Sequence, residues 1–336
     1  MTHADPSEAL EALALGAEPS LTRAQVEQAS GIPDPLARML WRALGFPDVA
    51  GAAAFTEADV EALRIVRSLL DRGLVDEDTA VVLARGLGQT TARLADWQVE
   101  ALGRFFVESH GLQGRDLASD ADAFATVERT TAELIPDLQA LLGYAWRRQL
   151  AAVLERRLAR TDEMAVGAQV SATVGFADLV GFTRLSRQLE DADLATLVER
   201  FESVSADVVA ATGAELVKTV GDEVLFVAES AEQAAEASMR LHEAHAREPE
   251  VPEMRIGLAT GPVLRRMGDV FGSTVNLASR ITALARPGAT LVDAATARQV
   301  SESPGFRLRQ MAPRRIRGVG VIRSFALLRT DGDEAS

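Results

Sequence analysis

Residues 171–179 read SATVGFADL, and residues 214–228 read AELVKTVGDEVLFVA. In the second stretch two apolar runs flank Gly221-Asp222, and such a pair between apolar runs is typical of a tight hairpin turn. From Val170, just before the first stretch, apolar side chains alternate with the two-residue period of a β-strand, at Val170, Ala172, Val174 and Phe176. These stretches therefore predict three strands, two of them joined as a hairpin.

Further strands and helices surround these strands. Strands are predicted for MRIGLATG (254–261) and ATLVDA (289–294), and a short hairpin lies between them. Helices are predicted at about 231–246 and for STVNLASRITALA (273–285), which Pro287-Gly288 ends. One more helix closes at Gly213 and carries Leu194, Leu197, Val198, Phe201, Val204 and Val208. Helices alternating with short strands indicate an α+β fold with helices over one sheet face.

The first 160 residues have a different pattern. Apolar residues recur three and four apart, as in VEALRIVRSLL and ADWQVEALGRFF, and Gly, Pro and Asp mark the breaks between helices. We therefore expect an all-helical domain at 1–145, a linker helix at 146–168 and the α+β domain at 169–330.

Composition limits the classes of function. The 336 residues are 47% apolar, enough for two cores, and they contain no cysteine and four scattered histidines, so any metal should bind to carboxylates. The net charge is -14, of which about -12 falls in residues 1–145, and this disfavours nucleic acid and anionic membranes as partners. No apolar run approaches the ~20 residues of a membrane span, and the acidic start is unlike a signal peptide. These features predict a cytoplasmic protein.

Two aspartates are candidate metal ligands. Asp178 ends an apolar strand just before the turn into the next helix, where free backbone N–H groups favour a phosphate with its magnesium. Asp222 lies in the predicted hairpin turn. Taken singly, each aspartate is more often a helix cap or an ordinary turn residue. If their strands are neighbours, both carboxylates reach one sheet edge and can hold two divalent cations against a triphosphate.

A helix carries the third candidate group. Asn276 and Arg280 are one turn apart and share a face, while Val275, Ala278 and Ile281 supply the buried side. Such a pair on its own usually faces solvent. Near a phosphate, an arginine offers a planar fork for developing charge, and an asparagine amide can orient a ribose.

Three strings together resemble class III adenylyl cyclases over residues 170–327. They are FADLVGFT (176–183), KTVGDE (218–223) and DVFGSTVNLASR (269–280), and they stand in that family's order and at its spacing. The resemblance implies a ferredoxin-like βαββαβ-type catalytic domain that converts ATP to cyclic AMP and pyrophosphate as a homodimer. A lone chain would be inactive, because the metal residues and the asparagine and arginine come from opposite subunits.

The resemblance also assigns roles to single residues. Asp178 and Asp222 would bind two Mg²⁺ or Mn²⁺ ions. Lys218 and Asp269 would read the adenine, Asn276 would position the ribose, and Arg280 would stabilise the transition state at the α-phosphate. Phe182 and Thr183 would line the substrate site. Arg317 would contact the terminal phosphates, although Arg314 and Arg315 compete for that assignment.

The purine preference has a physical basis in the same pair. Adenine presents an N6 donor and an N1 acceptor, which suit a carboxylate and an ammonium group. Lys218 and Asp269 supply these groups, whereas guanylyl cyclases typically have Glu and Cys there. ATP is therefore favoured over GTP, and a guanylate cyclase stays as an alternative.

The N-terminal segments LTRAQVEQASGI (21–32) and AFTEADVEALRIVRSLLDRGL (54–74) resemble MerR-type helix-turn-helix proteins. They also resemble the regulatory domain of pH-responsive, fatty-acid-binding class III adenylyl cyclases. DNA binding is disfavoured because it needs a basic face. The second resemblance implies autoregulation, with pH or a fatty acid or other lipid as the signal, and the basic helix from Trp146 to Arg160 is the candidate connector between two states.

Other interpretations remain open at this point. The residues VGDEV (220–224) are superficially similar to a diguanylate cyclase signature, but that enzyme would not need the Asn276/Arg280 helix. A catalytically weak cyclase-homology module, used for dimerisation and signalling, is the other alternative. A DNA-binding regulator with a sensor domain is the third.

Overall fold

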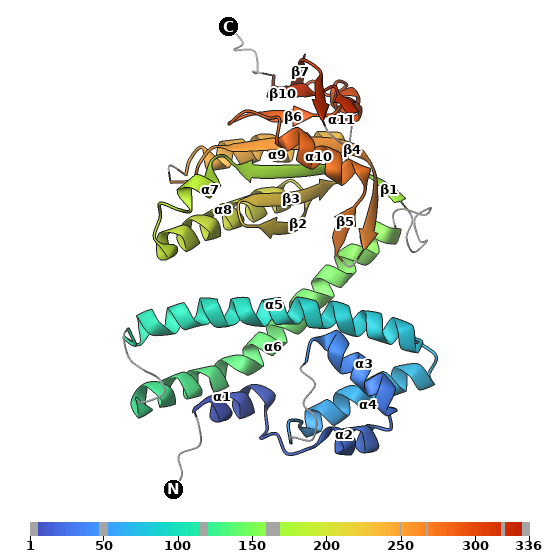
Figure 1. The fold of residues 1–336 in the computed structure, drawn as a ribbon, viewed down its shortest axis with the longest axis vertical. Coiled ribbons are helices and arrows are strands. Elements are labelled where there is room, and N and C mark those ends of the chain that lie inside the picture. The colour runs from blue at the N-terminus through green and yellow to red at the C-terminus, as the bar shows by residue number, and fades with distance from the viewer. Residues whose placement is uncertain are drawn as a thin grey trace. The chain divides into compact units, whose positions relative to one another are not determined.

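The chain forms two compact units, Met1–Glu155 and Arg156–Ser336 (Figure 1). The computed structural model describes residues 6–46, 53–113, 120–158, 169–248, 250–266, 268–316 and 320–330. The predicted borders at 145 and 168 stay predictions. Helix α6 (Ala121–Leu158) continues through residue 145 without a break, and residues 159–168 lie outside the described part.

The described part of the first unit is helical, as predicted. Thr22 begins α2 with a capping box, in which its hydroxyl accepts from the Gln25 backbone and the Gln25 side chain accepts from the Thr22 backbone. Asp76 caps α5 by accepting from the backbone N–H of Thr79 at 2.8 Å. The helices are α1 (Pro6–Leu15), α2 (Arg23–Ser30), α3 (Asp34–Leu44), α4 (Glu57–Asp71), α5 (Glu77–Ser109) and α6.

One apolar core joins α2, α3, α4 and the start of α5. Trp41 of α3 is buried there, and its ring lies 5.6 Å from that of Phe55. Gly88 of α5 meets the α3 backbone so closely that an added Cβ would lie 2.3 Å from the carbonyl oxygen of Leu44. Among the described helices, none combines the length and apolar composition that crossing a membrane requires.

The second unit is built on a mixed sheet with strand order β2-β3-β1-β4-β6-β10-β7, and β5 pairs with β4 (Figure 1). All pairs are antiparallel except β4 with β6. The strands are β1 (Gln169–Leu179), β2 (Glu215–Val220), β3 (Glu223–Ala228), β4 (Met254–Arg266), β5 (Asp269–Phe271), β6 (Thr290–Val292), β7 (Phe306–Gln310), β8 (Arg314–Ile316), β9 (Gly320–Ile322) and β10 (Phe325–Arg329). Strands β8 and β9 form a separate hairpin.

The first part of this unit has ferredoxin-like topology. The order β1-α8-β2-β3-α9-β4 along the chain gives the spatial order β2-β3-β1-β4, as a βαββαβ fold requires. This confirms the predicted fold class. The helices are α7 (Phe182–Leu185), α8 (Asp191–Ala211), α9 (Ala231–His245), α10 (Ser273–Thr282) and α11 (Ala294–Val300).

Helices cover both faces of the sheet, so the expectation of one covered face is wrong. Apolar side chains of α8, α9 and α11 pack in one core cluster, whereas Ala278 of α10 packs in another with Val174 and Phe176. Gly257 of β4 explains the close approach of α10, because an added Cβ would lie 2.3 Å from the backbone N of Thr282. Helix α10 also ends at Thr282, earlier than predicted.

Two histidines near the end of α9, His245 buried and His242 partly buried, are held uncharged. Burial lowers the pKa of His242 to about 4, and burial with a smaller contribution from His242 lowers the pKa of His245 to about 4. His242 Nε2 lies 3.1 Å from Thr290 Oγ1, and His245 Nε2 lies 3.1 Å from Ser205 Oγ. Both imidazoles therefore act as parts of the core.

These histidines should make the second unit acid-sensitive. The unfolded chain takes up their protons as the pH falls below about 6.5, whereas the folded chain does so only near pH 4, so stability is full above that range and is lost within it. Between pH 7 and pH 5 each histidine should cost about 2 kcal/mol. Urea unfolding followed by circular dichroism checks this, with His245→Gln as the control. Equal pH dependence in both proteins would show that His245 is not the cause.

Candidate active site

Asp178 lies near the end of the central strand β1, between the first residues of its two neighbours, β3 and β4. This end of the three strands is the sheet edge meant below. Its backbone is in register with Glu223 of β3 on one side and with Arg255 of β4 on the other. Arg255 Nε donates to Asp178 Oδ2 at 2.6 Å, and Arg255 Nη2 lies 2.5 Å from the same oxygen. The strand pairing thus sets a carboxylate, an arginine and a second carboxylate side by side.

Asp222 approaches Asp178 from the turn between β2 and β3. Gly221 before it has φ 61°, a left-handed conformation that favours glycine, and the backbone carbonyl of Asp222 accepts from the N–H of Leu179 at 3.0 Å. The side chain of Asp222 is close enough to Asp178 to raise its pKa. The structure therefore brings the two predicted metal ligands together.

The charges at this edge are unbalanced toward the acidic side. Burial raises the pKa of Asp178, the Asp222 carboxylate raises it further, and Arg255 opposes both. Burial and then the Asp178 and Asp222 carboxylates likewise raise the pKa of Glu223. Crowded carboxylates of this kind attract cations.

The donor set fits a hard divalent cation. Asp178 and Asp222 supply carboxylate oxygens, which Mg²⁺ prefers, and Mg²⁺ usually binds through one or two carboxylates together with water and phosphate oxygens. In the described part of the chain, no group of three His, Asp or Glu side chains is arranged to hold a metal ion. The pair therefore needs ligands from a bound phosphate and water.

The proposed base-reading residues lie together within one chain. Lys218 Nζ contacts Asp269 Oδ2 at 2.5 Å, and Asp269 Oδ1 accepts from the backbone N–H of Val270 at 2.8 Å. Burial raises the pKa of Asp269, but the hydrogen bonds from Lys218 and Val270 outweigh it and hold the pKa below its usual value. Strands β2 and β5 thus present an ammonium and a carboxylate as a preformed pair.

Helix α10 presents Asn276 and Arg280 to solvent. Both residues are exposed, and neither side chain has a hydrogen-bond or ion-pair partner within the described ranges. Ala278 and Ile281 are buried beneath them, as predicted, whereas Val275 is only partly buried. The helix therefore holds an amide and a guanidinium that are free to bind a ligand.

The other residues predicted to bind the substrate differ in how far they are buried. Phe182 begins the short helix α7 after Gly181 (φ 78°) and packs partly against the core beneath α8 and α9. Thr183 is exposed. Arg317 lies outside the described residues, and Arg314 and Arg315 on β8 are exposed.

Sequence reasoning missed Arg255. Its signal was an arginine within the apolar strand MRIGLATG, which is unusual for a central strand. Only the register places this arginine beside Asp178, because β4 follows β1 by 75 residues and the pairing is not encoded locally. Arg255 is a further candidate for binding phosphate, since its guanidinium reaches the same edge of the sheet.

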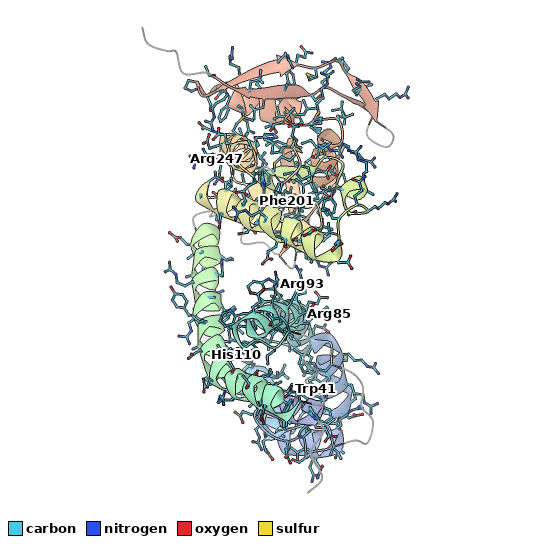
Figure 2. The ribbon with its side chains drawn as sticks, turned by 90° about the vertical axis from the view of Figure 1, so that its left-hand side faces the viewer. Trp41, Arg85, Arg93, His110, Phe201 and Arg247 are labelled. Atoms are coloured by element: carbon cyan, nitrogen blue, oxygen red, sulfur yellow. The ribbon has the colours of Figure 1, made fainter. Side chains whose placement is uncertain are left out.

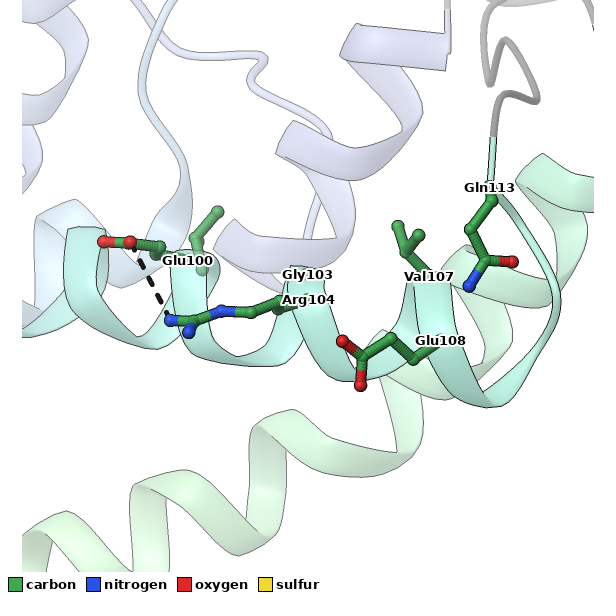
Figure 3. Close-up of a pocket in the computed structure, with 7 residues that line it drawn as sticks. Glu100, Gly103, Arg104, Val107, Glu108 and Gln113 are labelled. Carbon is green, nitrogen blue, oxygen red and sulfur yellow. Dashed lines mark ion pairs between the residues drawn. The ribbon is translucent and has the colours of Figure 1, made fainter. Parts of the chain in front are cut away.

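The first unit has an open groove along the C-terminal half of α5 (Figure 3). Its volume is about 530 Å³, and Gly103 is one of its lining residues, where an added Cβ would meet no atom within 4 Å. Val99 and Val107 line it, one helical turn to each side, with Glu100, Arg104, Glu108 and Gln113 around them.

Comparison with known proteins places this chain in a family. Residues 165–329 match the Adenylate and Guanylate cyclase catalytic domain model. An adenylate cyclase of Streptomyces coelicolor is 44% identical over 98% of this chain and 92% of its own length. One of Streptomyces griseus is 47% identical over 87% and 71%.

A sequence relative and a solved structure are more distantly similar to this chain. A pH-sensitive adenylate cyclase of Mycobacterium tuberculosis is 29% identical over 91% of this chain and 77% of its own length. The crystal structure of the adenylyl cyclase CyaB from P. aeruginosa aligns with a TM-score of 0.43 and 21% identity, covering 49% of this chain and 97% of that one. With relatives more than 40% identical over almost its whole length, the chain belongs to the class III nucleotidyl cyclase family, as an adenylate cyclase.

Proposed function

We propose that two copies of this chain build a site that converts ATP to 3′,5′-cyclic AMP and pyrophosphate. The observation that carries the proposal is that one chain holds three separate groups of residues, each suited to one part of the reaction. Asp178 and Asp222 lie close enough to interact, Lys218 and Asp269 form an ion pair, and α10 offers an unengaged amide and guanidinium. In a two-fold dimer each copy can complete the site of the other.

The reaction needs one bond made and one broken at the α-phosphorus. The ribose 3′-hydroxyl gives its proton to water, and its oxygen bonds to the α-phosphorus while the bond from that phosphorus to the pyrophosphate oxygen breaks. Divalent cations, which class III cyclases use, would stabilise the attacking oxygen and the leaving pyrophosphate when bound at Asp178 and Asp222. Arg280 would stabilise charge on the phosphoryl oxygens, and Asn276 would orient the ribose.

The experiment for this proposal is an assay of purified protein with ATP or GTP and Mg²⁺ or Mn²⁺. Cyclic AMP from ATP is the expected product. An excess of cyclic GMP from GTP would favour the guanylate cyclase alternative. No product from either nucleotide would favour a non-catalytic signalling module. The same assay without a divalent cation should give no product.

The Lys218/Asp269 pair should set the preference for adenine. Asp269→Ala removes the acceptor for adenine N6 and leaves Lys218 without its partner, so kcat/KM for ATP should fall about ten- to a hundred-fold. Steady-state rates with ATP and GTP measure this. Glu215→Ala is the matched control, because it breaks another ion pair, Arg265–Glu215 at 2.6 Å, and leaves Lys218 intact. An unchanged ATP rate in Asp269→Ala would remove the pair from base recognition.

We further propose that the helical unit regulates the catalytic unit. Support comes from α6, which continues from the first unit to Leu158. Residues 159–168 then connect it to β1. The sequence resemblance suggests pH or a lipid as the signal, and the groove at Gly103 is where an acyl chain would bind. Val99 and Val107 give the groove apolar walls, which suit an aliphatic chain.

Truncation tests the regulatory proposal. A protein that starts at Ala165 lacks the helical unit and should differ severalfold from the full chain in turnover, because it no longer responds to α6. Rates of both proteins across pH 5 to 8, with and without oleate, separate the two candidate signals. Equal rates under all these conditions would contradict regulation by the first unit.

A further inference from the structure

Arg255 contacts Asp178 through only one of its carboxylate oxygens. Arg255 Nε donates to Asp178 Oδ2 at 2.6 Å, and Arg255 Nη2 lies 2.5 Å from that same oxygen. In the described part of the chain, no hydrogen bond from Arg255 reaches Asp178 Oδ1. A guanidinium matches a carboxylate best when two parallel N–H groups meet two different oxygens. The contact is therefore an incomplete ion pair.

Another arginine of the same unit shows the complete form. Arg200 of α8 donates from Nε to Glu248 Oε2 and from Nη2 to Glu248 Oε1, both at 2.8 Å. Figure 2 shows α8 with Phe201, the residue after Arg200, labelled. Each nitrogen of that pair has an oxygen of its own. Compared with it, the contact between Arg255 and Asp178 satisfies fewer groups, so it should be easier to exchange for other partners.

The strands fix the backbone of this pair and leave the Arg255 side chain accessible. Arg255 and Asp178 are in register in the β1–β4 ladder, and the next pair of that ladder, Ala177 with Ile256, is buried. The side chain of Arg255 is 34% exposed, whereas that of Asp178 is 17% exposed. The long side chain of Arg255 can therefore change partner without any movement of the sheet.

Arg255 also offsets the crowding of negative charge at the sheet edge. Asp178 stands beside Glu223 in the β1–β3 ladder, and Asp222 follows from the adjoining turn. Burial and neighbouring carboxylates raise the pKa of Asp178 and of Glu223, and Arg255 opposes the rise in both. A divalent cation would answer the same negative charge. The guanidinium and a cation therefore compete for one electrostatic role.

We propose that Arg255 keeps Asp178 from binding a divalent cation until a triphosphate takes up the guanidinium. This inference rests on the proposed function, in which Asp178 and Asp222 hold cations beside the phosphates. Arg255 and a cation draw on the same carboxylate, and two positive charges close together repel each other. A phosphate offers the guanidinium two oxygens in place of one, so a bound triphosphate favours the exchange. Arg255 thereby couples cation binding to nucleotide binding.

Binding of Mn²⁺ to the full chain without nucleotide tests the proposal. Electron paramagnetic resonance measures free Mn²⁺ directly, so the result does not depend on turnover. Arg255→Gln should bind Mn²⁺ about three- to ten-fold more tightly than the wild type, because the competing positive charge is gone. Adding Asp222→Ala to Arg255→Gln should abolish this tighter binding, which assigns it to the proposed site.

Two control variants separate the charge of Arg255 from its shape. Arg200→Gln removes the same charge from the complete pair on α8, so its Mn²⁺ affinity should equal that of the wild type. Arg255→Lys keeps the charge and loses the planar fork, so it should also stay close to the wild type. If circular dichroism shows Arg255→Gln to be unfolded, the uncharged Arg255→Met, of similar length, takes its place.

The outcomes that overturn this inference differ from those that overturn the proposed function. Equal or weaker Mn²⁺ binding in Arg255→Gln would contradict the competition, and so would tighter binding in Arg255→Lys. Such results from a wild type that still forms cyclic AMP would leave the proposed function intact. A wild type that forms no cyclic AMP would refute the proposed function instead.

The coupling itself is measured with 3′-deoxy-ATP, which lacks the attacking hydroxyl and so binds without reacting. Equilibrium dialysis gives its affinity with and without saturating Mn²⁺. The ratio of the two affinities should be several-fold smaller in Arg255→Gln than in the wild type. Chelation of Mn²⁺ by the nucleotide in solution is the same for both proteins and cancels in this comparison. An equal ratio in both proteins would show that Arg255 does not couple the two ligands.

Discussion

Replacing Asp222 with alanine should lower the rate of cyclic AMP formation by about a thousand-fold or more, equivalent to ~4 kcal/mol of barrier. Asp222 and Asp178 are the two carboxylates at the edge where β1 meets the β2–β3 turn. With one of them gone, the site loses a ligand that water cannot replace in a fixed position.

The same variant should remain folded. Asp222 raises the pKa of Asp178, which means that the two carboxylates repel each other, so removing one relieves this repulsion. Its backbone carbonyl still accepts from Leu179. Thermal unfolding should therefore occur at or slightly above the wild-type temperature, and Glu302→Ala, an exposed acidic turn residue, is the control for activity. Retained turnover in Asp222→Ala would refute the metal assignment.

Replacing Arg280 with alanine should have the second largest effect. Its guanidinium is exposed on α10 and has no partner within the described chain, so its loss should leave the fold intact. If it stabilises charge that develops only in the transition state, kcat should fall about a hundred- to a thousand-fold while KM changes little.

A conservative change separates charge from geometry. Arg280→Lys keeps the positive charge but loses the planar fork, so it should recover only a small part of kcat. Arg298, at the end of α11, is an exposed arginine outside the proposed site, and Arg298→Ala should keep wild-type rates. If Arg280→Ala raised KM and left kcat unchanged, Arg280 would bind the ground state instead.

The fold was largely predictable because its signals are local. The alternating residues of β1, the Gly221-Asp222 turn and the apolar spacing of α8 each appear within a few residues. The position of α10 was not predictable in this way. It depends on Gly257, a residue in another strand whose missing side chain admits Thr282, and no local pattern reports a close approach between distant segments.

The site was predictable in part for a related reason. Asp178 and Asp222 each end or join strands, so a shared sheet edge brings them together once those strands are neighbours. Lys218 and Asp269 are 51 residues apart, and only the family resemblance linked them before their contact was seen. Arg255 was missed because only the register of β1 and β4 shows that it lies beside Asp178.

Mixing two inactive variants tests most directly whether the site is shared between copies. One variant carries Asp178→Ala and Asp222→Ala, and the other carries Asn276→Ala and Arg280→Ala. After random exchange of equal amounts, half of the dimers pair the two variants, and each of these keeps one of two sites complete, so about a quarter of wild-type activity should return. A mixture as inactive as its separate components would contradict a shared site.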